Sequence, residues 1–103
     1  MHAAVQNKQS LIFLLKENGQ RLRSFGVLTL SLFGSFITGK LHADSDVDLL
    51  VEFDPEKKSY DNFMDLSFFL EELLGRKVEV VTPQSLSKYI GQHIINQAEN
   101  VSF

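Results

Sequence analysis

The sequence lacks cysteine and tryptophan, has two prolines and contains no long hydrophobic run. The absence of cysteine excludes disulfide frameworks and thiolate zinc sites, and the three histidines lack the spacing of metal ligands, which also excludes zinc hydrolases. No stretch approaches the ~18 apolar residues of a membrane-spanning helix, and the N-terminus lacks the features of a signal peptide. We therefore expect a cytoplasmic protein that does not associate with membranes.

Length and overall charge narrow the class of protein further. A chain of 103 residues, 44% of them hydrophobic and nine of them Phe, fits one domain over residues 1–103 with enough bulk for a packed core. Ten basic and thirteen acidic residues leave a net charge of −3, so we expect no direct nucleic-acid binding.

Negative charge is concentrated in one segment of the chain. Asp44, Asp46 and Asp48 fall within five residues, and no Lys or Arg lies between Leu41 and Glu52. Carboxylates crowded in this way repel one another unless a cation is present.

The pattern of apolar residues predicts alternating helices and strands. Ser10 is the expected cap of a first helix that ends at Asn18-Gly19, and a short second helix follows before Gly26. In the first strand, Leu28, Leu30 and Leu32 are expected on one face. The expected strands are residues 27–33, 46–53 and 77–82, and the expected later helices are residues 60–74 and a final helix opened by Pro83. This order predicts an α/β (α+β) fold with a small mixed sheet flanked by helices.

The chemically informative motif is Gly34-Ser35, followed after ten residues by Asp46-Val47-Asp48. Two carboxylates at positions i and i+2 of a strand project from one face, ~6–7 Å apart at the backbone, and suit Mg²⁺. Gly34 at a strand end lets the backbone approach a phosphate, and Ser35 adds a hydroxyl and an amide. Gly39 supplies another flexible point, so the motif predicts a phosphate cradle beside a metal site.

Other interpretations of these residues remain open at this point. Asp44-x-Asp46-x-Asp48 begins like an EF-hand loop, although Leu49 and Pro55 occupy the positions of the required Gly and Glu. Asp46 and Asp48 would also fit a solvated acidic turn before an edge strand, and Gly34-Ser35 alone would fit a β-turn. Elsewhere, Glu79 would fit an exposed charge on a strand face. The group Phe63, Phe68 and Phe69 is expected in the core, and no role is assigned to His42 or His93.

The segment GSFITGKLHADSDVDLLV resembles the nucleotidyltransferase signature of the DNA polymerase β superfamily. The order of elements along nearly the whole chain is similar to that of the minimal nucleotidyltransferase (MNT) family. The resemblance implies a polymerase-β-like nucleotidyltransferase fold. It also implies that Asp46 and Asp48 coordinate one or two Mg²⁺ ions, and that Ser35 and the backbone around Gly34 hold the triphosphate of ATP.

Two departures from the family pattern accompany this resemblance. Glu79 matches the third family carboxylate, which is usually Asp, and is therefore the candidate third metal ligand and general base. The segment Phe36-Ile37-Thr38 replaces a stretch that commonly carries Arg before Gly39, so Thr38 and Lys40 complete the expected nucleotide-binding set, with Lys40 as a point charge.

The resemblance also implies a function. Minimal nucleotidyltransferases are typically antitoxins that transfer AMP from ATP to a tyrosine of a HEPN-type toxin, so a HEPN-type protein is the expected partner. Two alternatives are a catalytically weak antitoxin that neutralises its partner by stoichiometric binding, and transfer to a small-molecule hydroxyl such as that of an antibiotic.

Overall fold

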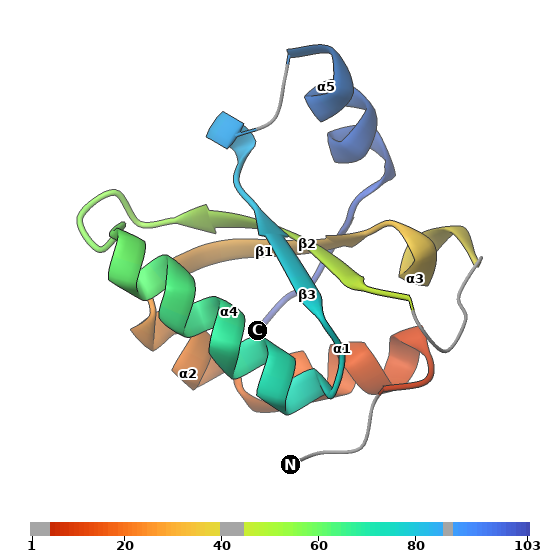
Figure 1. Cartoon of the computed structure of the whole chain (residues 1–103), viewed down its shortest axis with the longest axis horizontal. Helices are drawn as coiled ribbons and strands as arrows, with labels where there is room; N and C mark the ends of the chain where they lie inside the picture. The colour runs from red at the N-terminus through yellow and green to blue at the C-terminus, as the bar shows by residue number, and fades with distance from the viewer. Residues whose placement is uncertain (1–4, 40–44, 86–87) are drawn as a thin grey trace.

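The computed structural model describes residues 5–39, 45–85 and 88–103. Its centre is a four-stranded mixed sheet with the strand order β3-β2-β1-β4 (Figure 1). Strand β1 pairs antiparallel with β2 and β4, whereas β2 and β3 are parallel. The strands are β1 Val27–Phe33, β2 Val47–Phe53, β3 Val78–Val81 and β4 Glu99–Asn100. The expected mixed sheet is therefore confirmed.

The helices are unevenly placed around this sheet. Helices α1, α2 and α4 lie together below the sheet in Figure 1, and α5 lies away from them at the top. The helices are α1 Lys8–Glu17, α2 Gly19–Ser24, α3 Ser35–Thr38, α4 Tyr60–Leu74 and α5 Lys88–Gln97, and a 3₁₀ turn spans Pro83–Ser85. No helix in these described ranges is both long and apolar enough to cross a membrane.

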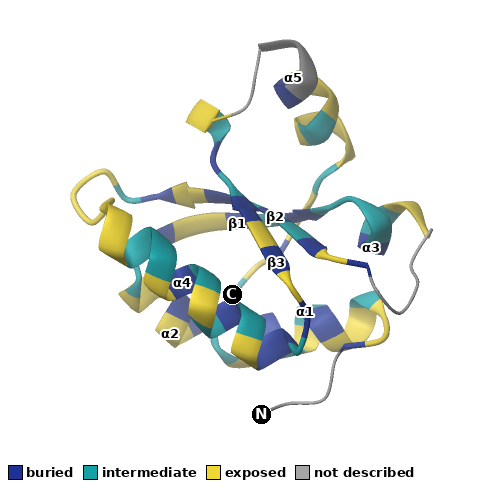
Figure 2. Ribbon diagram, in the orientation of Figure 1, coloured by how far each residue is buried: buried dark blue, intermediate teal, exposed yellow. Residues whose placement is uncertain are grey.

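The hydrophobic core fills the space between the sheet and the three-helix layer. The inner faces of these elements are buried and their outer faces exposed (Figure 2). Alternation along β2 buries Val47, Leu49 and Val51 completely and turns Asp48 to the opposite face. The other fully enclosed side chains are Leu11, Leu15, Leu22, Leu30, Leu32, Leu66, Leu70 and Leu74.

Capping explains where the two long helices of the core begin. The Asn7 side chain accepts a hydrogen bond from the Ser10 amide (2.8 Å), so α1 begins one turn before the expected boundary. Ser10 lies inside the helix, so the prediction that it caps α1 is wrong. Helix α4 begins as expected, with the Ser59 hydroxyl accepting a hydrogen bond from the Asn62 amide (3.1 Å), and ends at Gly75 in the left-handed conformation.

Two expectations about the core are wrong. The pairing of β1 with β2 shifts between Val27 and Thr29, so Val27 is buried and Leu28 is 54% exposed. On α4, Phe63 and Phe69 pack against the core, but Phe68 is 60% exposed because it lies on the outer face of the helix.

The C-terminal part also differs from the expected single helix. Pro83 opens a short 3₁₀ turn, and α5 starts at Lys88 after two residues outside the described ranges. Strand β4 was not expected, because two exposed polar residues carry no strand pattern. The pairing of β4 with β1 adds an edge strand to the sheet.

Candidate functional site

Asp48 occupies the middle of the sheet on the face opposite the helical layer. In the antiparallel pair it lies opposite Phe33, the last residue of β1, and in the parallel pair it lies beside Glu79 of β3. Its half-buried carboxylate therefore stands where β1 ends and the backbone turns into α3.

Gly34 brings the backbone against this carboxylate. A Cβ atom built on Gly34 would overlap Oδ2 of Asp48 and would lie 3.0 Å from its Cγ. Gly34 also has φ 77° and ψ −147°, a conformation that side chains strongly disfavour. The two halves of the sequence motif, Gly34-Ser35 and Asp46-Val47-Asp48, are thus brought together.

The short helix α3 presents backbone donors next to Asp48. The Gly34 carbonyl accepts from the amides of Ile37 (2.9 Å) and Thr38 (3.0 Å), and Gly39 in the left-handed conformation ends the turn. Ser35 is half-buried, whereas Thr38 and Gly39 are exposed. Lys40, the remaining residue of the expected nucleotide-binding set, lies outside the described residues, as does Asp44.

The electrostatics of the site are unfavourable without a cation. Burial, as the largest cause, and then the negative charges of Glu79 and Asp46 together raise the pKa of Asp48 from 3.8 to about 6. Both neighbouring carboxylates are therefore close enough to act on Asp48.

The three expected carboxylates are not equivalent. Asp46 is exposed and precedes the first residue of β2, so it lies at the strand entrance rather than within the strand. Glu79 is exposed on β3. Carboxylate oxygens are the kind of ligand that suits Mg²⁺, but within residues 5–39, 45–85 and 88–103 no three acidic or histidine side chains converge closely enough to hold a metal ion.

Arg76 contacts two segments that carry expected site residues, and the sequence analysis did not predict it. The side chain is buried, with Nε donating to the Val5 carbonyl (2.7 Å) and Nη1 donating to the Ser45 carbonyl (2.9 Å). Its guanidinium carbon lies 5.4 Å from the centre of the Phe36 ring on α3. A lone Arg beside Lys77 carries no sequence signal for burial, because charged residues between elements are usually exposed.

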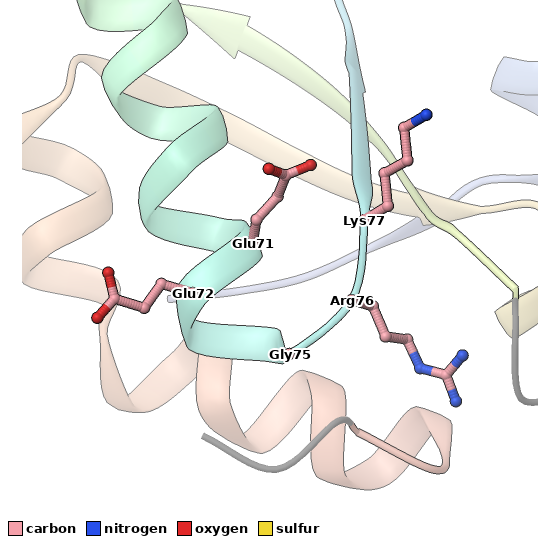
Figure 3. Close-up of a pocket in the computed structure, with 5 residues that line it drawn as sticks. All are labelled: Glu71, Glu72, Gly75, Arg76 and Lys77. Atoms are coloured by element: carbon pink, nitrogen blue, oxygen red, sulfur yellow. The ribbon is translucent and has the colours of Figure 1, made fainter. Parts of the chain in front are cut away.

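The hollow next to Arg76 lies apart from the carboxylates. It has a volume of about 730 Å³ and is lined by the last turn of α4 and the segment that leads to β3, with Glu71, Glu72, Gly75, Arg76 and Lys77. Figure 3 shows the Arg76 side chain pointing away from α4, toward the side where β2 begins. Neither Asp46 nor Asp48 lines this hollow, so it does not replace the sheet face as the candidate site.

Comparison with known proteins identifies the family of this chain. The model of the nucleotidyltransferase domain family matches residues 14–101, and the protein adenylyltransferase MntA of Thermococcus cleftensis is 38% identical over 82% of this chain and 85% of its own length. The chain therefore belongs to the nucleotidyltransferase domain family and, within it, to the minimal nucleotidyltransferases. The expected enzyme class, nucleotidyltransferase, is confirmed.

Solved structures share the fold. A minimal nucleotidyltransferase structure superposes with a TM-score of 0.80 at 26% identity, covering 91% of this chain and 95% of the other. A toxin–antitoxin complex with AMP-PNP contains a chain that superposes with a TM-score of 0.66 at 25% identity, covering 94% of this chain and 73% of the other. The polymerase-β-like fold implied by the sequence motif is thereby confirmed.

Proposed function

We propose that this nucleotidyltransferase moves AMP from ATP onto a hydroxyl of a partner protein, a tyrosine of a HEPN-type toxin, and so acts as an antitoxin. The observation that carries the proposal is the close approach of Gly34 to the Asp48 carboxylate, which places backbone donors and acidic ligands side by side. The adenylyltransferase activity named for the Thermococcus cleftensis relative, and the toxin–antitoxin complex with AMP-PNP, support the nucleotide and the kind of partner.

In this proposal the phosphates lie against α3. The amides of Ser35 and Phe36 precede the first intrahelical donors and have no acceptor in the described part of the chain, so they face the triphosphate together with the Ser35 hydroxyl. Thr38, Gly39 and Lys40 follow along the same segment and complete the nucleotide-binding set. The exposure of Thr38 and Gly39 leaves them accessible to a ligand.

The carboxylates act at the other end of the reacting phosphate. Asp46, Asp48 and Glu79 would hold Mg²⁺, which when bound neutralises the triphosphate and lowers the pKa of the acceptor hydroxyl. The acceptor oxygen forms a bond to the α-phosphorus, the bond from that phosphorus to the bridging oxygen breaks, and pyrophosphate leaves. Glu79, exposed beside Asp48, takes the proton of the acceptor hydroxyl.

A second candidate is an antitoxin that neutralises its partner by binding alone. The observation that favours it is the exposure of Glu79 together with the lack of a three-carboxylate cluster among the described residues. In this case Glu79, which stands where the family usually has Asp, would belong to a site with little catalytic turnover.

Transfer of label from α-labelled ATP into the co-expressed partner, with and without Mg²⁺, tests the proposal. Asp46→Asn and Asp48→Asn should each lower the rate by about 1000-fold or more while the complex still forms, since the metal-binding charge is lost. Glu52→Gln is the matched control, because Glu52 is an exposed carboxylate on β2 away from α3, and it should retain the wild-type rate.

The outcomes separate the candidate functions. Loss of neutralisation in the Asp46→Asn complex indicates catalysis, whereas neutralisation retained without any label transfer indicates binding alone. Label found in an added aminoglycoside and absent from protein would replace the proposed acceptor with a small molecule.

A further inference from the structure

We infer that Arg76 is a positioning residue that sets the spacing between the carboxylates and the phosphate-binding turn. The inference deepens the proposed function and rests on it for its catalytic consequence. Its geometric part stands on contacts of Arg76 with three separate segments of the chain.

The first contact fixes the entrance of β2. Nη1 of Arg76 donates to the carbonyl of Ser45, the residue directly before Asp46. On the other side of Asp46, the Val47 amide donates to the carbonyl of Lys77 (2.9 Å), the residue directly after Arg76. The backbone of Asp46 is therefore held on both sides by two consecutive residues of one segment.

The second contact reaches the phosphate-binding turn. The Arg76 guanidinium lies against the ring of Phe36, which is 5% exposed and belongs to α3. Phe36 follows Gly34-Ser35 directly in the sequence, so its position determines where the amides of that turn point. One buried cation thus contacts both halves of the site.

The third contact, to Val5, does not explain the placement of Arg76 by itself. The N-terminal segment has a separate anchor, because the Val5 amide donates to the Leu74 carbonyl (3.0 Å). A guanidinium serves all three segments because its planar fork carries several donors in fixed directions and stacks on an aromatic ring. A lysine ammonium supplies a point charge without this geometry.

Arg76→Met and Arg76→Lys test the inference, with Arg21→Met as the matched control. Arg21 also lies over aromatic rings, those of Phe25 (5.7 Å) and Phe69 (5.0 Å), but it belongs to α2, on the side of the sheet away from Asp48. Two readouts are needed. One is kcat and KM for ATP in label transfer, and the other is amide hydrogen exchange at Val47.

Arg76→Met should lower kcat about 10- to 100-fold, leave KM for ATP within about threefold, and speed exchange at Val47 about 10-fold. Exchange in the middle of β2 should not change. Arg76→Lys should fall between this variant and the wild type, and Arg21→Met should match the wild type in both readouts.

Two results would overturn the inference. One is a folded Arg76→Met protein with wild-type kcat and wild-type exchange at Val47, and the other is a raised KM with unchanged kcat, which would assign Arg76 to nucleotide binding. If Arg76→Met does not fold, Arg76→Lys decides by the same readouts. If the wild type transfers no nucleotide, the proposed function fails, and exchange at Val47 alone decides the role of Arg76.

Discussion

Asp48 is held in a place that disfavours its own charge. Its carboxylate is half-buried, lies beside Glu79 and near Asp46, and has a pKa raised to about 6. A charge that is unfavourable in the free protein becomes favourable when a cation binds, so the residue that lowers stability is also a proposed ligand of Mg²⁺.

Stability should therefore depend on pH through Asp48. Because the pKa is higher in the folded state than the 3.8 of the unfolded chain, the folded state binds the proton more tightly. The stabilisation from this proton is fully present below pH ~4 and is lost as pH rises through about 6.

Asp48→Asn should therefore raise the free energy of unfolding at pH 8 by about 1 kcal/mol, after a reduction for solvent screening of this half-exposed group. Near pH 4 the difference from the wild type should vanish. Urea unfolding at both pH values, without divalent cations, measures the effect. An Asp48→Asn protein less stable than the wild type at pH 8 would contradict the argument.

At the scale of elements, α3 is a four-residue helix bounded by two glycines of positive φ. The two positions differ in their surroundings. A Cβ atom on Gly34 would meet Asp48, whereas a Cβ atom on Gly39 would meet nothing within 4 Å. Substituting each glycine in turn therefore separates the stability lost to backbone strain from the stability lost when a side chain crowds the Asp48 carboxylate.

Gly39→Ala should cost about 1 kcal/mol of stability, from backbone strain alone, because no atom lies within 4 Å of the added methyl group. Gly34→Ala should cost about 3 kcal/mol and reduce transfer at least 100-fold, since the added methyl group displaces the Asp48 carboxylate. Urea unfolding and the transfer assay measure both effects. Equal losses of stability in the two variants would show that Asp48 does not limit the space at Gly34.

The elements also show how far sequence reasoning reaches. Period-two alternation identified β2 and the opposite faces of Val47 and Asp48, because burial of one face dictates that pattern. The exposure of Leu28 was not predictable, since the shift in pairing that causes it depends on the partner strand. Strand β4 was missed for the same reason, because its two residues gain their conformation from β1 alone.

The same limit applies to the candidate site. The spacing from Gly34-Ser35 to Asp46 and Asp48 indicated the chemistry, and the fold brings both parts together. Arg76 was invisible because its partners are backbone carbonyls and a ring from segments far away in the sequence. Because every residue has a backbone carbonyl, such contacts place no requirement on the amino-acid type of the partner and produce no sequence pattern.

At the scale of the molecule, the sheet is completed by a segment from the far end of the sequence. Val101 is buried and its amide donates to the Leu30 carbonyl (2.8 Å), next to the pairing of β4 with β1. An exposed ion pair, Lys8 to Glu99 (3.1 Å), joins the same segment to α1. Burial rather than this ion pair should hold the segment in place.

Val101→Ala should therefore lower the free energy of unfolding by about 2 kcal/mol and Tm by about 10 °C. Glu99→Gln should cost less than ~0.5 kcal/mol, because both side chains of the pair are partly solvated. Thermal and urea unfolding compare the two variants. A larger loss of stability for Glu99→Gln than for Val101→Ala would show that the ion pair, and not burial, holds the C-terminal segment in place.

The close packing of Gly34 against Asp48 has a consequence for how the gene can change. Every substitution that replaces glycine by another amino acid introduces a Cβ atom, so no replacement at position 34 avoids the carboxylate. The clash is relieved only when Asp48 is replaced by a smaller residue, which removes a proposed metal ligand, while the backbone strain at position 34 remains. The two positions are therefore mutationally coupled, and a larger residue at position 34 in a descendant gene would mark a lineage in which the carboxylate had already been lost.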